Sequence, residues 1–77
     1  MTRVPIPKPC YLDQLKRIPR RVPPRWESPN QDRYYEWDAY HGEIEVYDRR
    51  GNHLGVIDAM TGDFQKGAVR GRKIDVS

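Results

Sequence analysis

The 77-residue chain has few of the features that usually stabilise a small protein, attach it to a membrane or enlarge its core. It has one cysteine, Cys10, which excludes an internal disulfide and which we interpret as an ordinary small side chain. No apolar run approaches membrane-spanning length and no signal-peptide core is present, so we expect a soluble domain that does not insert into a membrane. Only 36% of the residues are hydrophobic, which predicts a single small domain over residues 1–77 with a thin core.

Proline is absent after Pro29, and this absence divides the chain into two parts. Six of the seven prolines lie between residues 5 and 24, which predicts an extended arm over residues 1–33. The arm holds eight Lys or Arg against three acids, whereas residues 34–77 hold six against eight. A basic arm before an acidic body suits an enzyme that acts on nucleic acid, although basic arms also serve solubility alone.

One short helix is expected inside the arm, over residues 10–18 (CYLDQLKRI). Leu12, Leu15 and Ile18 recur every three residues and would form one face of about two helical turns. A proline on either side would suit the first turn and the end of this helix.

The second part of the chain has the two-residue period of β-strands. In residues 41–48 (HGEIEVYD), polar side chains at His41, Glu43, Glu45 and Tyr47 alternate with apolar or small ones. The turn DRRGN and the strand HLGVID follow, so residues 43–58 predict an antiparallel hairpin. The segments FQKG and RGRKIDV predict one or two more strands. We therefore expect an α+β, mostly β fold: an antiparallel sheet over residues 34–77 with a short N-terminal helix.

The polar face of that strand holds groups that could cleave RNA without a metal. Such cleavage needs a base for the 2′-hydroxyl, an acid for the leaving 5′-oxygen and a cation for the charge on phosphorus. Glu45, His41 and an arginine meet these needs, and Asp38 could hydrogen bond to His41 and set its tautomer. The alternative is a solvated strand face with scattered charges. Metal binding is disfavoured because no second ligand cluster accompanies HGEIE, and the zinc deaminase signature lacks its Pro-Cys-x-x-Cys part.

These motifs resemble the cytotoxic ribonuclease domain of the ribosome-inactivating colicins and cloacin. The stretch YEWDAYHGEIEVY, then GNHLGVID and TGDFQKG, follows the pattern of that family, and an upstream Arg-Trp pair lies at its spacing. The matching positions are Arg25–Trp26, Tyr35–Asp38, His41–Glu45, Tyr47, Gly51–Gly55, Thr61–Gly62 and Lys66–Gly67. The resemblance implies a strongly twisted antiparallel sheet with a short N-terminal helix.

The resemblance also implies an activity and the residues for it. Family members cut 16S ribosomal RNA once in the decoding centre, by attack of the 2′-hydroxyl, and so stop translation. Glu45 matches the general base, His41 the acid, and Asp38 an aspartate that either orients His41 or contacts a base beside the cut. Arg72 matches the arginine that stabilises the phosphorane, although Arg70 and Lys73 lie close to it. The further residues implied to contact substrate are Glu43, Tyr47, Lys66 and Arg25. No metal and no cofactor are implied.

Partners and location follow from the same resemblance. It implies a domain released from a producing bacterium that acts on the ribosome in the cytoplasm of a target bacterium, and an acidic cognate immunity protein. The basic run before Trp26 is weaker than in the family and the tail is less basic, which bears on RNA affinity more than on chemistry. Two alternatives remain: a non-catalytic relative that binds RNA or protein, and a ribonuclease with another substrate such as tRNA. His53 either faces the active side across the hairpin or is a structural histidine.

Overall fold

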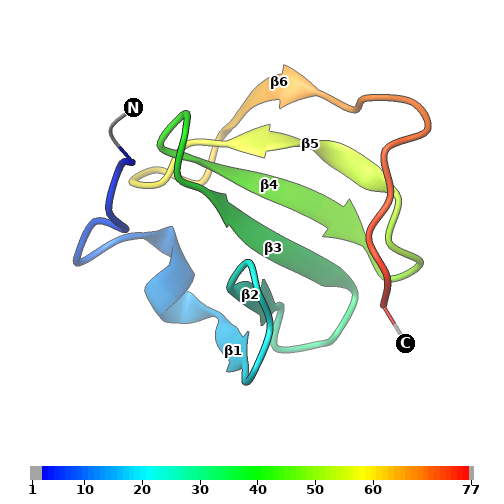
Figure 1. Cartoon of the computed structure of the whole chain (residues 1–77), viewed down its shortest axis with the longest axis horizontal. Coiled ribbons are helices and arrows are strands. Elements are labelled where there is room, and N and C mark those ends of the chain that lie inside the picture. The colour runs from blue at the N-terminus through cyan, green and yellow to red at the C-terminus, as the bar shows by residue number, and fades with distance from the viewer. Residues whose placement is uncertain (1–2, 77) are drawn as a thin grey trace.

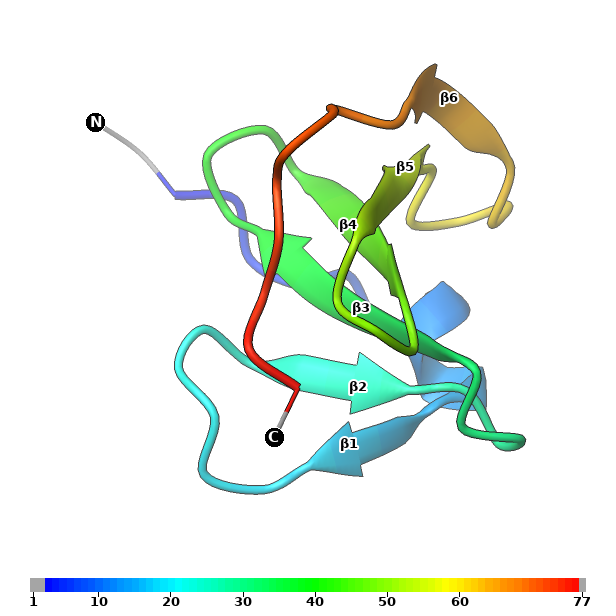
Figure 2. The same cartoon turned by 90° about the vertical axis from the view of Figure 1, so that its right-hand side faces the viewer.

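Residues 3–76 are described by a computed structural model, in which six antiparallel strands form one open sheet (Figure 1). The strands lie in the sheet in chain order, so each is joined to its neighbour by a turn or loop. They are β1 (Lys16–Ile18), β2 (Arg25–Glu27), β3 (Arg33–Asp38), β4 (Glu43–Asp48), β5 (His53–Ile57) and β6 (Phe64–Gly67). The mostly β, antiparallel prediction is confirmed, and the sheet is strongly twisted between β2 and β5 (Figure 2). In residues 3–76 no helix is long and apolar enough to cross a membrane.

One face of the sheet forms the hydrophobic core. On β4, Ile44 and Val46 are fully buried, and they pair with Ile57 and Gly55 of β5 and with Trp37 and Tyr35 of β3. The N-terminal segment covers this face. The buried core cluster comprises Cys10, Leu12, Trp26, Tyr35, Trp37, Ile44, Val46, Ile57 and Ala59. Trp37 therefore packs in the core, and Cys10 is a buried free thiol.

The helix expected over residues 10–18 is not confirmed. The chain makes only a 3-10 turn at Tyr11–Gln14, leaves helical geometry at Leu15, and enters β1. Apolar residues three apart fit the three-residue repeat of a 3-10 turn as well as they fit an α-helix. Leu12 and Leu15 still pack against the core, while the backbone that follows pairs with β2.

The strand boundaries differ from expectation at two places. The arm over residues 1–33 supplies β1 and β2, so the sheet includes more of the chain than residues 34–77. Strand β4 begins at Glu43, and His41 lies in the turn between β3 and β4. The hairpin predicted over residues 43–58 and the strand predicted at FQKG are both confirmed.

The last residues cross the end of the sheet as a strap. Of the one or two strands predicted at FQKG and RGRKIDV, only the first forms, and this C-terminal strap, residues 68–76, makes one isolated bridge, between Lys73 and Asn52. Figure 2 shows the strap running from β6 past β4 to β2. The Ile74 amide donates to the Gly51 carbonyl at 2.9 Å, and Gly51 has φ +87°. A side chain at Gly51 would collide with the Ile74 carbonyl, so glycine lets the strap pack closely here.

Candidate active site

The opposite face of the sheet carries the polar side chains. Glu43, Glu45 and Tyr47 alternate with the buried residues of β4 and therefore project from this face. Asp38 lies opposite Glu43, and Lys66 lies opposite Val56, which itself faces Glu45 across β4 and β5. Side chains from four neighbouring strands, β3 to β6, thus meet on one surface.

A pocket of about 210 Å³ lies on this surface. Six of the eight residues that the sequence analysis selected line it: Asp38, His41, Glu43, Glu45, Lys66 and Arg72. The others that line it include His53, Val56 and Val69. Tyr47 and Arg25 lie on the same face of the sheet but outside the pocket.

Asp38 and His41 form the first unit of the pocket. Asp38 Oδ2 lies 2.6 Å from His41 Nδ1, and Asp38 Oδ1 accepts the backbone amides of Tyr40 and His41. Burial raises the pKa of Asp38, but these hydrogen bonds outweigh it and hold the pKa below its ordinary value. Asp38 is therefore an ionised acceptor, Nδ1 of His41 carries a hydrogen, and Nε2 faces outward on a side chain that is 66% exposed.

Glu45 forms the second unit, together with His53 and Arg72. The Glu45 Oε1 atom lies 2.9 Å from His53 Nε2 and 2.6 Å from an Arg72 guanidinium nitrogen. The Val69 amide donates to His53 Nδ1 at 2.9 Å, so Nδ1 has no hydrogen and Nε2 must be the nitrogen that donates to Glu45. In the part of the chain that the structure describes, no hydrogen bond reaches Glu45 Oε2, which leaves that oxygen open to the pocket.

Glu43 and Lys66 form the third unit, and they bear on metal binding. Lys66 Nζ lies 3.0 Å from Glu43 Oε1. One ligand atom each from Asp38, His41 and Glu43 lie within 4.8 Å of one another, which is a spacing that a cation could use. The same side chains already hold the ion pair between Glu43 and Lys66 and the hydrogen bond between His41 and Asp38, with which a divalent ion would compete. The donor set therefore suits proton transfer better than metal binding.

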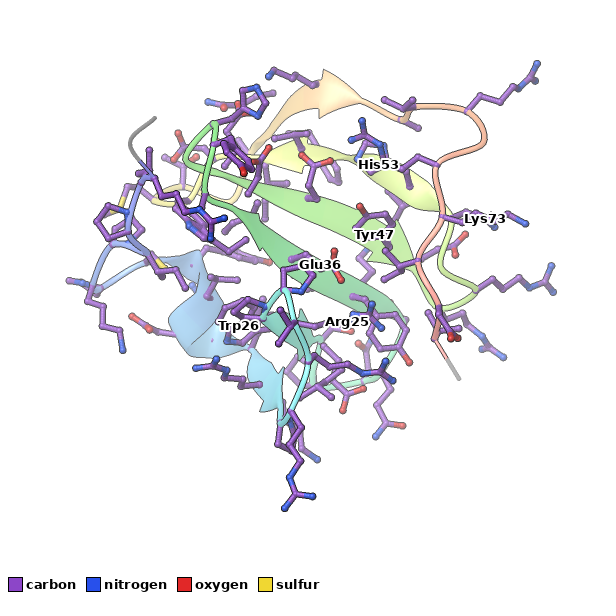
Figure 3. The ribbon with its side chains drawn as sticks, viewed as in Figure 1. Arg25, Trp26, Glu36, Tyr47, His53 and Lys73 are labelled. Carbon is purple, nitrogen blue, oxygen red and sulfur yellow. The ribbon has the colours of Figure 1, made fainter. Side chains whose placement is uncertain are left out.

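Tyr47 and Arg25 belong to a buried row next to the pocket (Figure 3). The His53 ring meets the Tyr47 ring edge-on, with centroids 5.3 Å apart. Burial, followed by the charges of Glu36 and Glu45, raises the pKa of Tyr47 to about 12. Arg25 turns inward, where its guanidinium lies 2.9 Å from Glu36 in a pair with little exposure. The Tyr47 hydroxyl thus stays protonated and uncharged near Glu45, while Arg25 points away from the pocket.

His53 is the functional residue whose place the sequence left open. Strict alternation from Val56 would put Leu54 on the polar face and His53 in the core. The ladder between β4 and β5 slips after Val46, so that Tyr47 pairs with His53 instead of Leu54. This bulge moves His53 onto the polar face. Its imidazole is fully enclosed there, against Glu45.

The pocket can transfer protons in opposite directions at two points. Glu45 Oε2 can accept a proton, and His41 Nε2 can donate one when the imidazole is charged. Arg72 and Lys66 line the same pocket and supply two positive charges, which can stabilise an anionic phosphoryl group. This combination suits the transfer of a phosphoryl group between two oxygens.

The sequence of the chain is similar to those of known proteins. The family described as Cytotoxic matches residues 13–75 of the chain. Cloacin and colicin E3, both from Escherichia coli, are each 46% identical to the chain over 44 residues. Colicin-E6 from the same organism is 43% identical over 44 residues. In each case the match covers 56% of this chain and 8% of the relative, so the chain corresponds to a small part of these proteins.

Proposed function

The chain belongs to the Cytotoxic family, the cytotoxic ribonuclease domains of colicins and cloacin, and we propose that it cleaves 16S ribosomal RNA at the decoding centre. The family makes it a colicin-like bacterial toxin domain. The RNA target, the reaction mechanism and the roles of single residues are the proposal.

The proposed reaction is an attack of the 2′-hydroxyl on the adjacent phosphate. Glu45 Oε2 takes the proton from the 2′-hydroxyl as the new bond from O2′ to phosphorus forms. His41 Nε2 gives its proton to the 5′-oxygen as the bond between phosphorus and that oxygen breaks. The products are a 2′,3′-cyclic phosphate and a free 5′-hydroxyl. No group outside the chain and its substrate is needed to balance the protons.

The other residues of the pocket hold these two groups and the phosphate in place. Asp38 orients His41, and Arg72 and Lys66 stabilise the charge on the pentacoordinate phosphorus. Arg72 must turn from Glu45 toward the phosphate, which frees the carboxylate to act as a base. Glu43 holds Lys66, and Tyr47 packs against the His53 ring beside the pocket. Arg25 is assigned to substrate binding through its support of this face and not through direct contact.

One observation supports the proposal most: two oppositely acting proton-transfer groups share one pocket with two cations. The Asp38–His41 pair and the Glu45–Arg72 pair come from different elements, and the fold brings them to the same small cavity. A module that only binds RNA needs the cations but neither the acid nor the base. The arrangement therefore favours the enzyme over the binding module.

The proposed reaction needs no metal, and the proposed domain has two partners, the ribosome and an immunity protein. Cleavage proceeds without a metal or another cofactor, since Lys66 already supplies the positive charge beside Glu43. The domain is released from its producer and acts in the cytoplasm of the target bacterium, on the ribosome. An acidic immunity protein protects the producer by covering the basic surface, in keeping with the net charge of +3.

The test is cleavage of intact 70S ribosomes by the purified domain, with products sized on a gel and their ends mapped. The unmodified domain should release a single fragment from the 3′ end of the small-subunit RNA. Glu45→Ala and His41→Ala should each lower the rate by about 10²–10⁴-fold, whereas Glu27→Ala, a matched change outside the pocket, should not. Cleavage of tRNA in preference to ribosomes would change the substrate, and no cleavage of any RNA would contradict the enzyme.

Whether cleavage needs a metal ion must be tested in a separate experiment without ribosomes, because EDTA disrupts them. A short RNA with the decoding-site sequence should be cut at the same rate with and without excess EDTA. Activity that falls with EDTA and returns with Mg²⁺ would contradict metal-independent cleavage and would assign an ion to Asp38, His41 and Glu43.

A further inference from the structure

A second cavity lies next to the pocket, on the far side of Asp38. Its volume is about 430 Å³, and its walls are mostly apolar. Val22, Pro23 and Pro24 form one side, and Tyr40 with the aliphatic edge of Ala39 forms another. None of these residues has a role in the reaction proposed above.

The apolar groups around this cavity are unusually exposed. Tyr40 is 60% exposed and Val22 is 97% exposed, although both could have been polar at no cost to the core. The Arg3 guanidinium lies over one face of the Tyr40 ring, 5.5 Å from its centre, and adds a positive charge at the cavity. An apolar cavity with an aromatic ring and a guanidinium suits a nucleobase, which is a flat aromatic ring attached to a negatively charged backbone.

Asp38 joins the two cavities, since it lines both. Its Oδ1 atom accepts the amides of Tyr40 and His41, so one carboxylate fixes the backbone that presents both rings. Tyr40 lines the apolar cavity, and His41 lines the pocket. Glu45 lines the pocket but not the apolar cavity. The apolar cavity is therefore at the end of the site that holds the acid, away from the base.

We propose that the cavity formed by Tyr40, Val22, Pro23 and Pro24 binds the nucleobase of the nucleotide on the 3′ side of the cut. The inference rests on the proposed function, because His41 protonates the 5′-oxygen of that nucleotide and so lies beside its sugar. A base splayed out of its stack turns into the cavity and lies on the Tyr40 ring. The contact selects RNA in which this base is unpaired.

The size of the effect follows from the strength of base–aromatic contacts. Loss of one such contact weakens binding by roughly five- to hundred-fold. Stacking needs the ring but not the hydroxyl of tyrosine. Tyr40→Ala should therefore raise KM for ribosomes by about this factor with little change in kcat, whereas Tyr40→Phe should match the unmodified domain. Met60→Ala removes an equally exposed apolar side chain from a turn outside both cavities and serves as the control.

The decisive measurement combines these variants with removal of one base from the substrate. The decoding-site RNA is prepared with an abasic ribose on the 3′ side of the mapped cut, and separately on the 5′ side. The 3′ abasic RNA should raise KM of the unmodified domain by the same factor as Tyr40→Ala, and Tyr40→Ala should then add nothing further. On the 5′ abasic RNA, Tyr40→Ala should still show its full effect.

The possible results separate this inference from the proposed function. Normal cleavage with no Tyr40→Ala effect beyond that of Met60→Ala would overturn the base site and leave the ribonuclease standing. An undiminished Tyr40→Ala effect on the 3′ abasic RNA would also overturn it, and would assign Tyr40 to another contact. Absence of cleavage by the unmodified domain would overturn the ribonuclease, and the base site with it.

Discussion

At the scale of single residues, hydrogen bonds decide which atom of each active-site group carries a proton. A backbone amide can only donate, so the Val69 amide makes Nδ1 of His53 an acceptor. An ionised carboxylate can only accept, so Asp38 makes Nδ1 of His41 a donor. The two histidines therefore have opposite tautomers. His53 holds Glu45, the proposed base, and His41 presents Nε2, which serves as the proposed acid when the imidazole is charged.

Replacing Asp38 by Asn should test the tautomer of His41. An amide nitrogen facing Nδ1 would favour the tautomer in which Nδ1 accepts, and it would remove the charge that stabilises the imidazolium. Asp38→Asn should lower kcat for ribosome cleavage by about 10²–10⁴-fold with the fold intact by circular dichroism. Asp63→Asn, in an exposed turn, provides the matched control. Retention of kcat within about threefold would show that Asp38 does not act through His41.

Replacing His53 by Ala should test the positioning of Glu45. Hydrogen bonds to a charged group contribute roughly 1.5–3 kcal/mol, so loss of this one should lower kcat about 10- to 150-fold while KM changes little. The Val69 amide also loses its acceptor, so the free energy of unfolding should fall in urea denaturation. Leu54→Ala, the neighbour in the bulge, controls for loss of packing in β5. Equal losses of kcat in both variants would contradict a specific role for His53.

At the scale of elements, three successive turns of the sheet begin with an aspartate. Asp38, Asp48 and Asp58 end or follow β3, β4 and β5, and each accepts backbone amides two to four residues ahead. These hydrogen bonds lower the pKa of all three carboxyl groups, against an opposing effect of burial that is largest at Asp38. The same local device thus shapes the turn that presents His41 and the turn against which the C-terminal strap packs.

The three turns should make the domain sensitive to acid. A carboxyl group whose pKa is lower in the folded state stabilises the fold above its unfolded pKa of about 3.9. That contribution is lost as the pH falls through the folded pKa. Asp48→Asn keeps an acceptor oxygen but loses the charge, so it should be less stable than the unmodified domain at pH 6. The difference in free energy of unfolding, measured in urea, should disappear near pH 2. A difference that is constant with pH would contradict the role of the charge.

At the scale of the whole molecule, one buried ion pair connects parts that are far apart in the sequence. Arg25 of β2 pairs with Glu36 of β3, and its guanidinium also donates to the Asp75 carbonyl in the strap at 2.5 Å. The strap carries Arg72 to Glu45. Arg25 therefore links the basic arm, the centre of the sheet and the element that completes the active site.

Breaking this pair should be costly, whereas replacing both partners should not. Arg25→Met leaves the Glu36 charge buried and should lower the free energy of unfolding by about 3–5 kcal/mol, a large part of the roughly 4–12 kcal/mol expected for this length. The double variant Arg25→Met with Glu36→Leu should recover most of that loss in urea denaturation. A single variant that costs less than about 1 kcal/mol would contradict the linking role. If the refolded double variant still binds ribosomes normally, Arg25 makes no direct RNA contact.

Local patterns in the sequence already determined the polar face of β4. Alternation over residues 43–47 placed Glu43, Glu45 and Tyr47 together, because side chains two apart on a strand must share a face. The hydrogen bond between Asp38 and His41 depends on the turn between them, because side chains three apart on a strand would point to opposite faces. The strand hairpin was equally local, since glycine and asparagine mark its turn.

Contacts between distant residues could be decided only by the tertiary structure. Periodicity cannot show a β-bulge, so the side of the sheet that His53 occupies depended on the slip between β4 and β5. Apolar residues three apart fit two kinds of helix, and pairing of β1 with β2 decided between them. The path of the strap decided that Arg72 reaches Glu45, and the burial of Glu36 turned Arg25 inward. Local geometry follows from neighbours along the chain. These outcomes depend instead on which distant groups the folded chain brings together to pair their hydrogen bonds and charges.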